Sequence, residues 1–375
     1  MSRTFRLVAG CSLPILLLTL SSPLRSQEED VLGKKKAEWL AILEKDEKPR
    51  MRKAAAIALG IVGPGKKDVL PALSKALAND KDEDVKLQIV SILSRVEPKD
   101  LQDSLETLAD VLKGDKSAAV RAGAANVMSN LGPLAKPALK TLVAALKDPD
   151  PATKAAVVAT IGKIGPDAAK MAMTEMLPLL KDDDLSVRFA AVFAYGRFGE
   201  EAVFVVPDLN LVLEKDVSAD VRREAAKTIG SLGPPAKIAV PSLVLALRED
   251  KSEEVRRQAV DALGKMGLEI RPALVFITES FKKDRDRSVR LHIVRAISAA
   301  LGSELKDQVP EMAEWLKKEP DGEVRLAIIQ ELGGLGYAAR AALPAIREAE
   351  SDSVLQVREA ARTAIKQIDV QTKKK

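Results

Sequence analysis

Cysteine, histidine and aromatic side chains are scarce in this sequence of 375 residues, which has one cysteine, one histidine and 3% aromatics. The cysteine is Cys11, near the N-terminus, so the rest of the chain has no thiol for a disulfide, a nucleophile or an iron–sulfur cluster. His292 has no second histidine with which to share a metal ion, and phosphate loops, zinc-ligand spacings and Ser-His-Asp sets are absent. We therefore expect no catalytic residue, no metal site, no cofactor and no small-molecule substrate.

A strong excess of charge is also missing. The formal net charge is +5, but Arg3, Arg6 and Arg25 lie in an N-terminal segment with the features of a removable signal, and Lys373–Lys375 form a basic tail. Subtracting these six positive charges from +5 leaves about −1 for the body of the chain. A body so close to neutral lacks the basic surface of a nucleic-acid-binding protein, so we expect no nucleic-acid partner.

Long apolar runs are confined to the N-terminus. Arg3 and Arg6 precede the run Leu7–Leu20, and a small, polar stretch follows it. A helix over this run would be about 21 Å long, shorter than the roughly 30 Å hydrocarbon layer of a membrane, and Pro14 interrupts it. These features are typical of a secretory signal peptide over residues 1–26, cleaved after Ser26. We expect an exported protein, either periplasmic or secreted.

Two alternatives would connect the N-terminal segment to a membrane. In the first, the segment is retained as an anchor. In the second, Cys11 is lipidated, because Val8-Ala9-Gly10-Cys11 resembles a bacterial lipoprotein processing box, although the apolar run follows the cysteine instead of leading up to it. A membrane is expected as a partner only in one of these two cases.

The chain consists largely of internal repeats. Close relatives of Val221–Gly233 (VRREAAKTIGSLG) recur at intervals of 33 to 35 residues from Met51 to the C-terminus. Each copy starts at an anchor residue that precedes a basic one. The anchors are Met51, Val85, Val120, Thr153, Val187, Val221, Val255, Val289, Val324 and Val357. So regular a period indicates a stacked repeat protein that forms one elongated domain.

Each unit begins with signals for a first helix and a loop. Apolar residues beside a proline, as in Val69–Leu73, predict the first helix, with proline in a first turn that tolerates it; in the first unit this helix is expected over Ala37–Leu43. Five positions before every anchor stands an acidic residue. These residues are Asp46, Asp80, Asp115, Asp148, Asp182, Asp216, Asp250, Asp284, Glu319 and Asp352.

Signals for a second helix follow. Three positions before the anchor, eight units have a residue that caps helix N-termini: Asp82, Ser117, Asp150, Asp184, Ser218, Ser252, Asp286 and Asp321. Apolar residues recur at the anchor and four, five, eight and eleven positions on, which is one face of a helix and predicts a continuous core. Glycine or serine nine positions on would let a neighbouring helix approach closely. Seven units have glycine twelve positions on, where a left-handed conformation would end the helix.

The repeated unit, Asp-x-Asp/Ser-x-x-Val-Arg-x-x-Ala-Ala-x-x-Leu/Ile-Gly-x-Ile/Leu-Gly, resembles the short HEAT-like repeats of bilin lyases and many bacterial repeat proteins. The resemblance covers Ala37 to about Ile368, and the Trp/Leu-Gly/Tyr signature of tetratricopeptide repeats is absent. It implies an all-α fold, a right-handed α-solenoid of about ten helical hairpins. We place this solenoid at residues 27–370, between the signal peptide at 1–26 and the basic tail at 371–375.

The basic residue after each anchor alternates with the acidic loop residue along the chain. In HEAT-like proteins such residues commonly bond between adjacent units, and the resemblance implies the same here. Each pair, if partly exposed, would contribute no more than about 1 kcal/mol, so the pairs would set the register of the units more than their stability.

Binding is the function that this architecture favours, because stacked second helices usually line a concave surface. Basic residues six or ten positions past the anchors predict a stripe along the groove, and unit five adds aromatics that the core rows do not explain. The candidate partner-binding residues are Arg95, Lys163, Phe189, Phe193, Arg197, Lys227, Lys265 and Arg295. We expect a non-enzymatic scaffold that binds a protein or peptide. A bilin-lyase-like enzyme and a binder of an anionic polymer remain the alternatives.

Overall fold

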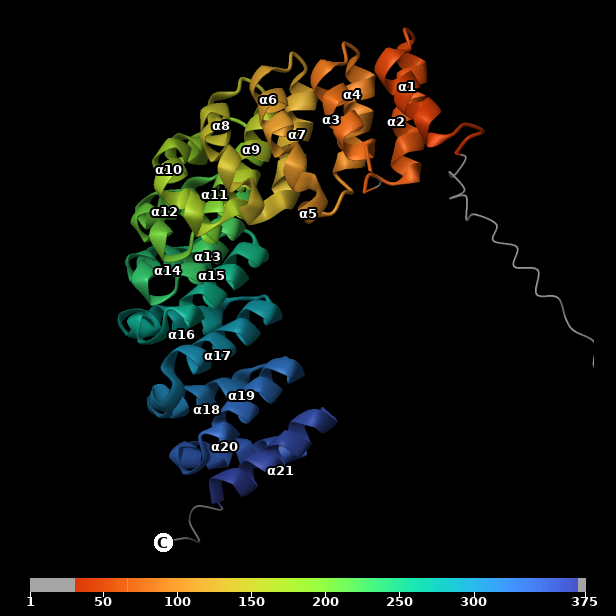
Figure 1. Ribbon diagram of the computed structural model, residues 1–375. Coiled ribbons are helices and arrows are strands. Elements are labelled where there is room, and N and C mark those ends of the chain that lie inside the picture. The colour runs from red at the N-terminus through yellow and green to blue at the C-terminus, as the bar shows by residue number, and fades with distance from the viewer. Residues whose placement is uncertain (1–30, 66, 370–375) are drawn as a thin grey trace, which may run out of the picture.

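The computed structural model describes residues 31–65 and 67–369, which form ten successive helical hairpins (Figure 1). The predicted all-α solenoid is confirmed, and no strand occurs in these two ranges. The signal peptide predicted at 1–26 and the basic tail predicted at 371–375 lie outside the described residues. Within the described ranges, no helix is both long and apolar enough to cross a membrane.

The second helix of each hairpin carries the anchor residue. These helices are α2 (Pro49–Val62), α4 (Glu83–Leu93), α7 (Ala118–Leu131), α9 (Pro151–Ile164), α11 (Leu185–Arg197), α13 (Ala219–Leu232), α15 (Glu253–Lys265), α17 (Arg287–Leu301), α19 (Gly322–Gly334) and α21 (Leu355–Asp369). From α9 onward they lie on the inside of the curved molecule (Figure 1).

The first helices form the outer layer from α8 onward (Figure 1). They are α1 (Lys36–Lys45), α3 (Val69–Asn79), α6 (Leu105–Gly114), α8 (Leu139–Ala144), α10 (Pro166–Met176), α12 (Val206–Lys215), α14 (Val240–Glu249), α16 (Leu274–Lys283), α18 (Val309–Lys318) and α20 (Leu343–Glu348). The first of them extends the predicted segment Ala37–Leu43 at both ends. Proline occupies an early helical position in α12, α14, α18 and α20, as predicted.

Short 3-10 segments and one short helix lie between the helices of the hairpins and between one hairpin and the next. These are α5 (Pro98–Leu101), η1 (Gln102–Ser104), η2 (Gly132–Ala138), η3 (Ala145–Lys147), η4 (Leu177–Lys181), η5 (Gly199–Val205), η6 (Pro234–Ala239), η7 (Gly267–Ala273), η8 (Gly302–Gln308), η9 (Gly336–Ala342) and η10 (Ala349–Ser351). Most of them precede a first helix and lead the chain from one unit to the next.

Side-chain caps open most of the second helices. Six of the eight predicted cap residues accept a hydrogen bond from a backbone N–H of the first turn. The prediction is wrong for Ser218 and Ser252, whose side chains make no such bond. Their helices carry Asp220 and the pair Glu253 and Glu254 in the first turn. These carboxylates supply negative charge at the positive end of the helix dipole by another route.

Glycine ends most of the second helices. All seven glycines predicted for this role have a positive φ, and Gly302 does too, one position later than in the pattern. At Gly132 (φ 53°, ψ −126°) and Gly233 (φ 64°, ψ −150°), however, ψ lies outside the left-handed helical region that the sequence suggested. This part of the backbone map is open essentially to glycine alone. The glycines therefore turn the chain sharply out of these second helices.

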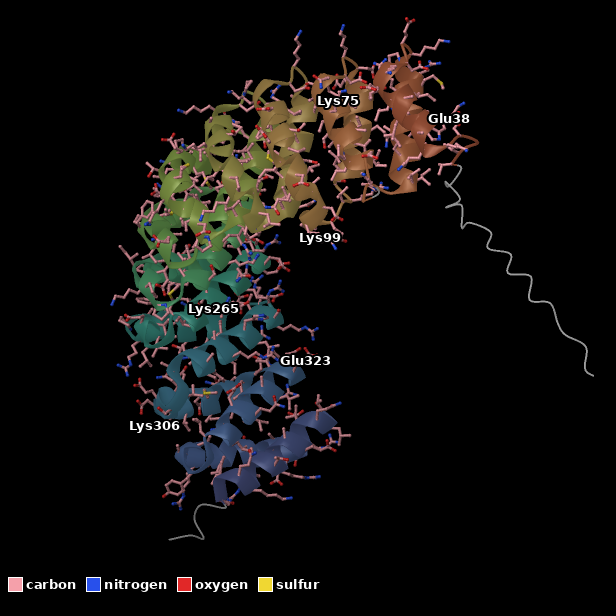
Figure 2. All side chains as sticks on the ribbon, in the orientation of Figure 1. Glu38, Lys75, Lys99, Lys265, Lys306 and Glu323 are labelled. Carbon is pink, nitrogen blue, oxygen red and sulfur yellow. The ribbon has the colours of Figure 1, made fainter. Side chains whose placement is uncertain are left out.

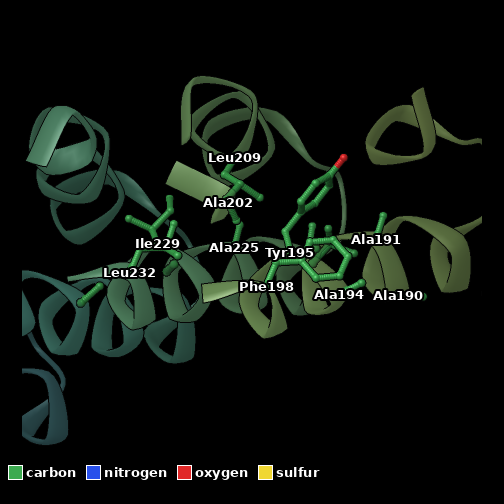
Figure 3. Close-up of a cluster of buried hydrophobic side chains, with 14 of the residues drawn as sticks. Ala190, Ala191, Ala194, Tyr195, Phe198, Ala202, Leu209, Ala225, Ile229 and Leu232 are labelled. Atoms are coloured by element: carbon green, nitrogen blue, oxygen red, sulfur yellow. The ribbon is translucent and has the colours of Figure 1, made fainter. Parts of the chain in front are cut away.

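The core runs through the whole stack along the predicted apolar rows. Of the residues eight and eleven positions past the anchors, only Ile365 and Leu335 are half-buried, and all others are buried. Figure 3 shows the middle of this core, where Tyr195 and Phe198 pack among alanines and meet edge to face with ring centres 5.9 Å apart. The core is therefore shared between neighbouring units, as in other repeat arrays.

Residue size sets the curvature. A Cβ added to Gly162 would lie 2.9 Å from Cα of Ala194 on the next second helix, and one added to Gly230 would lie 2.8 Å from Cα of Ala262. Between the outer helices α16 and α18, by contrast, Phe281 stacks on Trp315 with ring centres 4.1 Å apart. Small residues thus bring the inner helices together while bulky ones separate outer helices, and the array bends toward its inner layer.

A ladder of nine ion pairs joins each unit to the next, as the resemblance implied. The basic residue after an anchor bonds the loop carboxylate of the following unit, as in Arg222 to Asp250, Nε to Oδ2 at 2.7 Å. The other pairs are Arg52–Asp80, Lys86–Asp115, Arg121–Asp148, Lys154–Asp182, Arg188–Asp216, Arg256–Asp284, Arg290–Glu319 and Arg325–Asp352. Their carboxylates are more buried than we expected; the Asp250 side chain is 7% exposed. The regular charges are therefore structural.

Candidate partner-binding surface

The second helices leave one face open to solvent. They bury one side against the first helices and two flanks against neighbouring second helices, which leaves the positions one before and two, six and ten after the anchor on the open face. In α13, for example, Lys227 and Ser231 are exposed while Ala225, Ala226 and Ile229 are buried. Figure 2 shows Glu323, one position before an anchor, on the inner side of the curve, and Lys306 on the outer side. The predicted binding face is therefore the exposed face of these helices.

All six basic residues of the predicted stripe are exposed: Arg95, Lys163, Arg197, Lys227, Lys265 and Arg295. Lys227 bonds the buried carboxylate of Glu224 on its own helix, Nζ to Oε1 at 3.0 Å. The other five have no ion pair and no side-chain hydrogen bond with any residue that the structure describes. Five cations on one face are thus without counter-charges, in contrast to the ladder, where every cation but the last is paired.

The aromatic residues of unit five divide between the core and the surface. Tyr195 is fully buried; its hydroxyl donates to the carbonyl of Met173 at 2.7 Å, and burial raises the pKa of its hydroxyl above the usual range. Phe189 and Phe193 are half-buried on the open face of α11, and Phe189 also packs against the core. Phe204 lies on η5 and is 54% exposed. The two half-buried rings are therefore the aromatic part of this surface.

Three consecutive second helices, α7, α9 and α11, contain no acidic residue at all. Their open face consists mainly of small or neutral side chains, and it ends in the phenylalanines of α11. We call it the inner patch, and define it by Ala119, Ala122, Asn126, Ala155, Ala159, Phe189 and Phe193, with Arg95, Lys163 and Arg197 along its edge. It is an uncharged floor bordered by cations on one side.

The repeat pattern of the sequence predicts the cations and the phenylalanines of this patch but not its floor. Asn126 and Asn130 are exposed on α7, and Asn130 donates its side-chain N–H to the carbonyl of Ser94 at 2.9 Å. The signal was present in the sequence, since 118–131, 151–164 and 185–197 lack Asp and Glu. A pattern of charged residues at fixed positions does not reveal this signal, because the signal is an absence of charge over three helices.

Beyond α11 the same face becomes mixed in charge. Glu224 on α13 and Glu254 and Asp261 on α15 accompany Lys227 and Lys265. The predicted stripe is therefore not uniform. Lys163 and Arg197 stand on helices without carboxylates, whereas Lys227 and Lys265 stand on helices that have them. Arg95 follows α4, which carries Glu83 and Asp84 in its first turn, and Arg295 lies on α17, which has no acidic residue.

The histidine on this face is held by its own helix and its neighbour. Nδ1 of His292 is 2.7 Å from the carbonyl oxygen of Ser288, and Nε2 is 3.8 Å from Oδ1 of Asp261. The described residues contain no group of three or more His, Cys, Asp or Glu side chains placed to hold a metal ion. The arrangement around His292 is one of ordinary helix-surface hydrogen bonding.

Hollows lie elsewhere on the described part of the solenoid, and two of them are at its two ends. One, of about 690 Å³, opens between α1 and α3 and is lined by Leu40, Lys75 and Arg52 among others. Another, of about 530 Å³, lies between α19 and α21 and is lined mainly by uncharged residues, including Leu326, Thr363 and Gln367. Neither involves any of the eight predicted binding residues.

The fold defines the class of the protein as an α-solenoid built from helical hairpins. The model of HEAT repeats matches residues 36–129, 70–148, 105–194, 139–209 and 206–298. These matches cover 36–298 without a gap, so the chain belongs to the HEAT-repeat family, and the predicted resemblance is confirmed.

Solved structures give the same result at the level of the fold. A chain of the structure on Kap95p binding and the switch loops of RanGDP is similar to this one, with a TM-score of 0.60 and 11% identity. The match covers 90% of this chain and 51% of that one, so this chain spans about half the length of that protein. At this identity the similarity concerns the fold alone. In total 322 chains of solved structures match, so the fold by itself selects no partner. No curated protein matches the sequence.

Proposed function

We propose that this protein is a non-enzymatic scaffold that binds another protein, or a peptide segment of one, on the open face of its second helices. The observation that carries the proposal is the inner patch: three neighbouring helices without a carboxylate, with Phe189 and Phe193 half-buried at one end. Aromatic side chains are enriched among the interface residues that contribute most to binding.

Two further observations support a protein partner. The patch lies on the inner layer of a curved repeat array, which is the surface that such arrays commonly present to their ligands. The similar solved structure also concerns a protein complex, in which Kap95p binding acts on RanGDP. The floor of the patch is largely apolar or neutral, which suits the desolvated centre of a protein interface.

Site-specific photo-crosslinking in the native cell tests this proposal. A photoreactive phenylalanine analogue replaces Phe193 on the patch, and in a control it replaces Leu245, which is 45% exposed on the outer helix α14. We expect a discrete covalent adduct with another protein from position 193 and none from position 245. The combined change Phe193→Ala and Arg197→Asp should abolish recovery of that partner. An unchanged set of partners with intact folding would reject the patch as the binding site.

We also propose that the protein is exported, on the basis of the arginines and the apolar run in residues 1–26. N-terminal sequencing of the protein from its native cell tests this directly. A mature chain beginning after Ser26 supports export by a cleaved signal. An intact N-terminus, or a lipid on Cys11, would instead favour the membrane-attached alternatives.

A further inference from the structure

We infer that the inner patch binds an extended acidic segment of its partner, with carboxylates that reach Arg95, Lys163 and Arg197 and apolar side chains that cover the patch floor. This inference deepens the proposed function and rests on it. It names the chemistry of the partner, which the HEAT-repeat fold leaves open.

The cations along the edge of the patch lack counter-charges within the described residues. Arg95, Lys163 and Arg197 are exposed, and none has a carboxylate within ion-pair distance among the residues that the structure describes. Three exposed cations in the connections between units are paired instead: Lys136 with Asp167, Lys237 with Glu269 and Arg271 with Glu304. The acids that follow Arg197 beyond its glycine turn, Glu200 and Glu201, make no ion pair with it. The cations of the patch are therefore free for carboxylates from outside.

The spacing of the three cations predicts the spacing of the carboxylates in the partner. All three stand ten positions past their anchors, Arg95 just after the end of α4 and the other two on α9 and α11, so they form one row across the units. Neighbouring helices pack about 8 to 10 Å apart, and an extended chain rises about 3.3 Å per residue. One unit therefore matches about three residues of an extended peptide. The partner's carboxylates should stand about three and about six residues apart along the row.

The unit between the cations offers a contact to the peptide backbone. At the same register position, α7 has Asn130, whose side-chain N–H groups are turned toward the carbonyl of Ser94. Its side-chain oxygen accepts no hydrogen bond from any described residue. An extended segment can donate a backbone N–H to this oxygen between its two acidic contacts.

The small number of cations favours a peptide over an anionic polymer. Polyanion-binding surfaces neutralise many charges in a dense array, whereas this row has three cations spread over four units. Most of the patch is instead alanine, asparagine and phenylalanine. Half-buried rings such as Phe193 gain from covering by apolar side chains, which a peptide has and a polyphosphate or polysaccharide lacks.

A displayed random peptide library tests the inference with the whole protein. Peptides of about twelve residues are long enough to cross the four units. We expect selected sequences to be enriched in Asp and Glu at spacings of about three and six residues, with an apolar residue near them. The triple variant R95Q, K163Q and R197Q should lose this enrichment and bind a selected peptide at least about tenfold more weakly.

Lys306 provides the control. It is exposed on η8, on the outer side of the curved molecule (Figure 2), has no ion pair among the described residues and is not part of the inner patch. K306Q should therefore leave both enrichment and affinity unchanged. Enrichment without acidic residues, or equal affinity in the triple variant and the wild type, would overturn the inference.

Heparin and single-stranded DNA serve as probes of the polymer alternative. If either binds more tightly than the selected peptides, and its affinity falls steeply between about 50 and 200 mM salt without depending on Phe193, the patch is a polyanion site and the inference is wrong. The crosslinking experiment distinguishes failure of this inference from failure of the proposed function. A protein adduct at position 193 without any acidic preference leaves the proposed function standing and removes only this inference.

Discussion

The basic residues of each unit have two distinct roles, which depend on their distance from the anchor. A base directly after the anchor bonds the next unit, and its guanidinium also donates to backbone carbonyls of its own loop, as Arg222 does to Asp216 at 2.8 Å. A base ten positions after the anchor points away from the stack and is unpaired, as at Lys163. The same residue type thus sets register at one position and is available for binding at the other.

Breaking one rung of the ladder should destabilise the protein. Replacing Arg222 by alanine removes two hydrogen bonds to Asp250 and leaves that carboxylate, 7% exposed, without its counter-charge. We expect a loss of about 2 to 3 kcal/mol in the free energy of unfolding, measured by urea denaturation. A double-mutant cycle with Asp250→Ala should give a coupling energy of about 1 kcal/mol or more.

Arg358 is the built-in control for this experiment. It donates Nη1 to the carbonyls of Asp352 and Ser353 at 2.6 and 3.1 Å, as Arg222 does in its own loop, but pairs with no carboxylate in the described residues. Arg358→Ala should therefore cost less than half as much as Arg222→Ala. Equal losses for the two changes would mean that the bond to the next unit contributes nothing.

Acid should weaken the same ladder. Burial raises the pKa of Asp80, Asp148 and Asp182. The hydrogen bonds from Arg52, Arg121 and Lys154, the hydrogen bonds from backbone N–H groups and the attraction of nearby cations together outweigh it, so the net pKa of each carboxyl is lowered. In the unfolded chain these groups titrate near about 3.9. The unfolded state therefore binds more protons than the folded state as pH falls below that value, so this stabilisation is complete above it and is lost on acidification.

The urea midpoint should accordingly be flat near neutral pH and fall between about pH 5 and pH 3. Replacing Arg121 by glutamine removes the cation that lowers the pKa of Asp148, so the variant should show a shallower fall over the same range. A midpoint that rises on acidification, or identical profiles for both proteins, would contradict this account.

At the scale of the helix, the sequence predicted most of what the structure contains. The anchors and the apolar rows follow from a fixed period, because every unit repeats the same contacts, and the resemblance to HEAT-like repeats implied the bonding of the ladder between adjacent units. The sequence failed where units differ, as at Ser218 and Ser252, which have a capping residue type but no cap bond. It also could not show which cations of the stripe lack partners, because Lys163 and Lys227 look alike until Glu224 is seen beside only the second.

The glycines of the inner helices should be intolerant of even one added methyl group. In Gly230→Ala the new Cβ would lie 2.8 Å from Cα and 2.9 Å from Cβ of Ala262, both of which are part of a rigid helix. The inner helices must separate, and we expect a loss of about 1 to 3 kcal/mol despite the better helix propensity of alanine. Urea unfolding measures the loss, and small-angle scattering measures the change in curvature as an altered radius of gyration.

Gly334 is the matched glycine for that test. It is exposed on the second helix α19, and a Cβ there would meet no atom within 4 Å. Gly334→Ala should leave the radius of gyration unchanged and stabilise the protein by up to about 1 kcal/mol. If both changes stabilise the protein, close approach of the inner helices does not set the curvature.

At the scale of the whole molecule, stability depends on the interfaces between units because each hairpin touches only its neighbours. The last hairpin differs from the others in the residues on the side of α21 that faces away from α19. Where other units have small or apolar residues five and nine positions past the anchor, α21 has Arg362 and Lys366, both exposed. A polar side of this kind keeps the end of the array from behaving as an unmatched apolar interface.

If stability depends on contacts between neighbouring units, the number of helices released by weakening one interface should depend on where that interface lies in the array. Arg222 and Gly230 both contribute to the interface between α13 and α15. The double variant R222A and G230A should therefore unfold in two steps. The helices up to α13 and those from α14 onward should then exchange their amide hydrogens independently. Arg325 and Gly333 serve the interface between α19 and α21 in the same way. There, R325A with G333A should release only the last hairpin, because nothing described stacks beyond it. Hydrogen exchange with mass spectrometry measures both outcomes helix by helix. Uniform exchange across all helices in the central variant would mean that the array unfolds as one cooperative body, against the nearest-neighbour account.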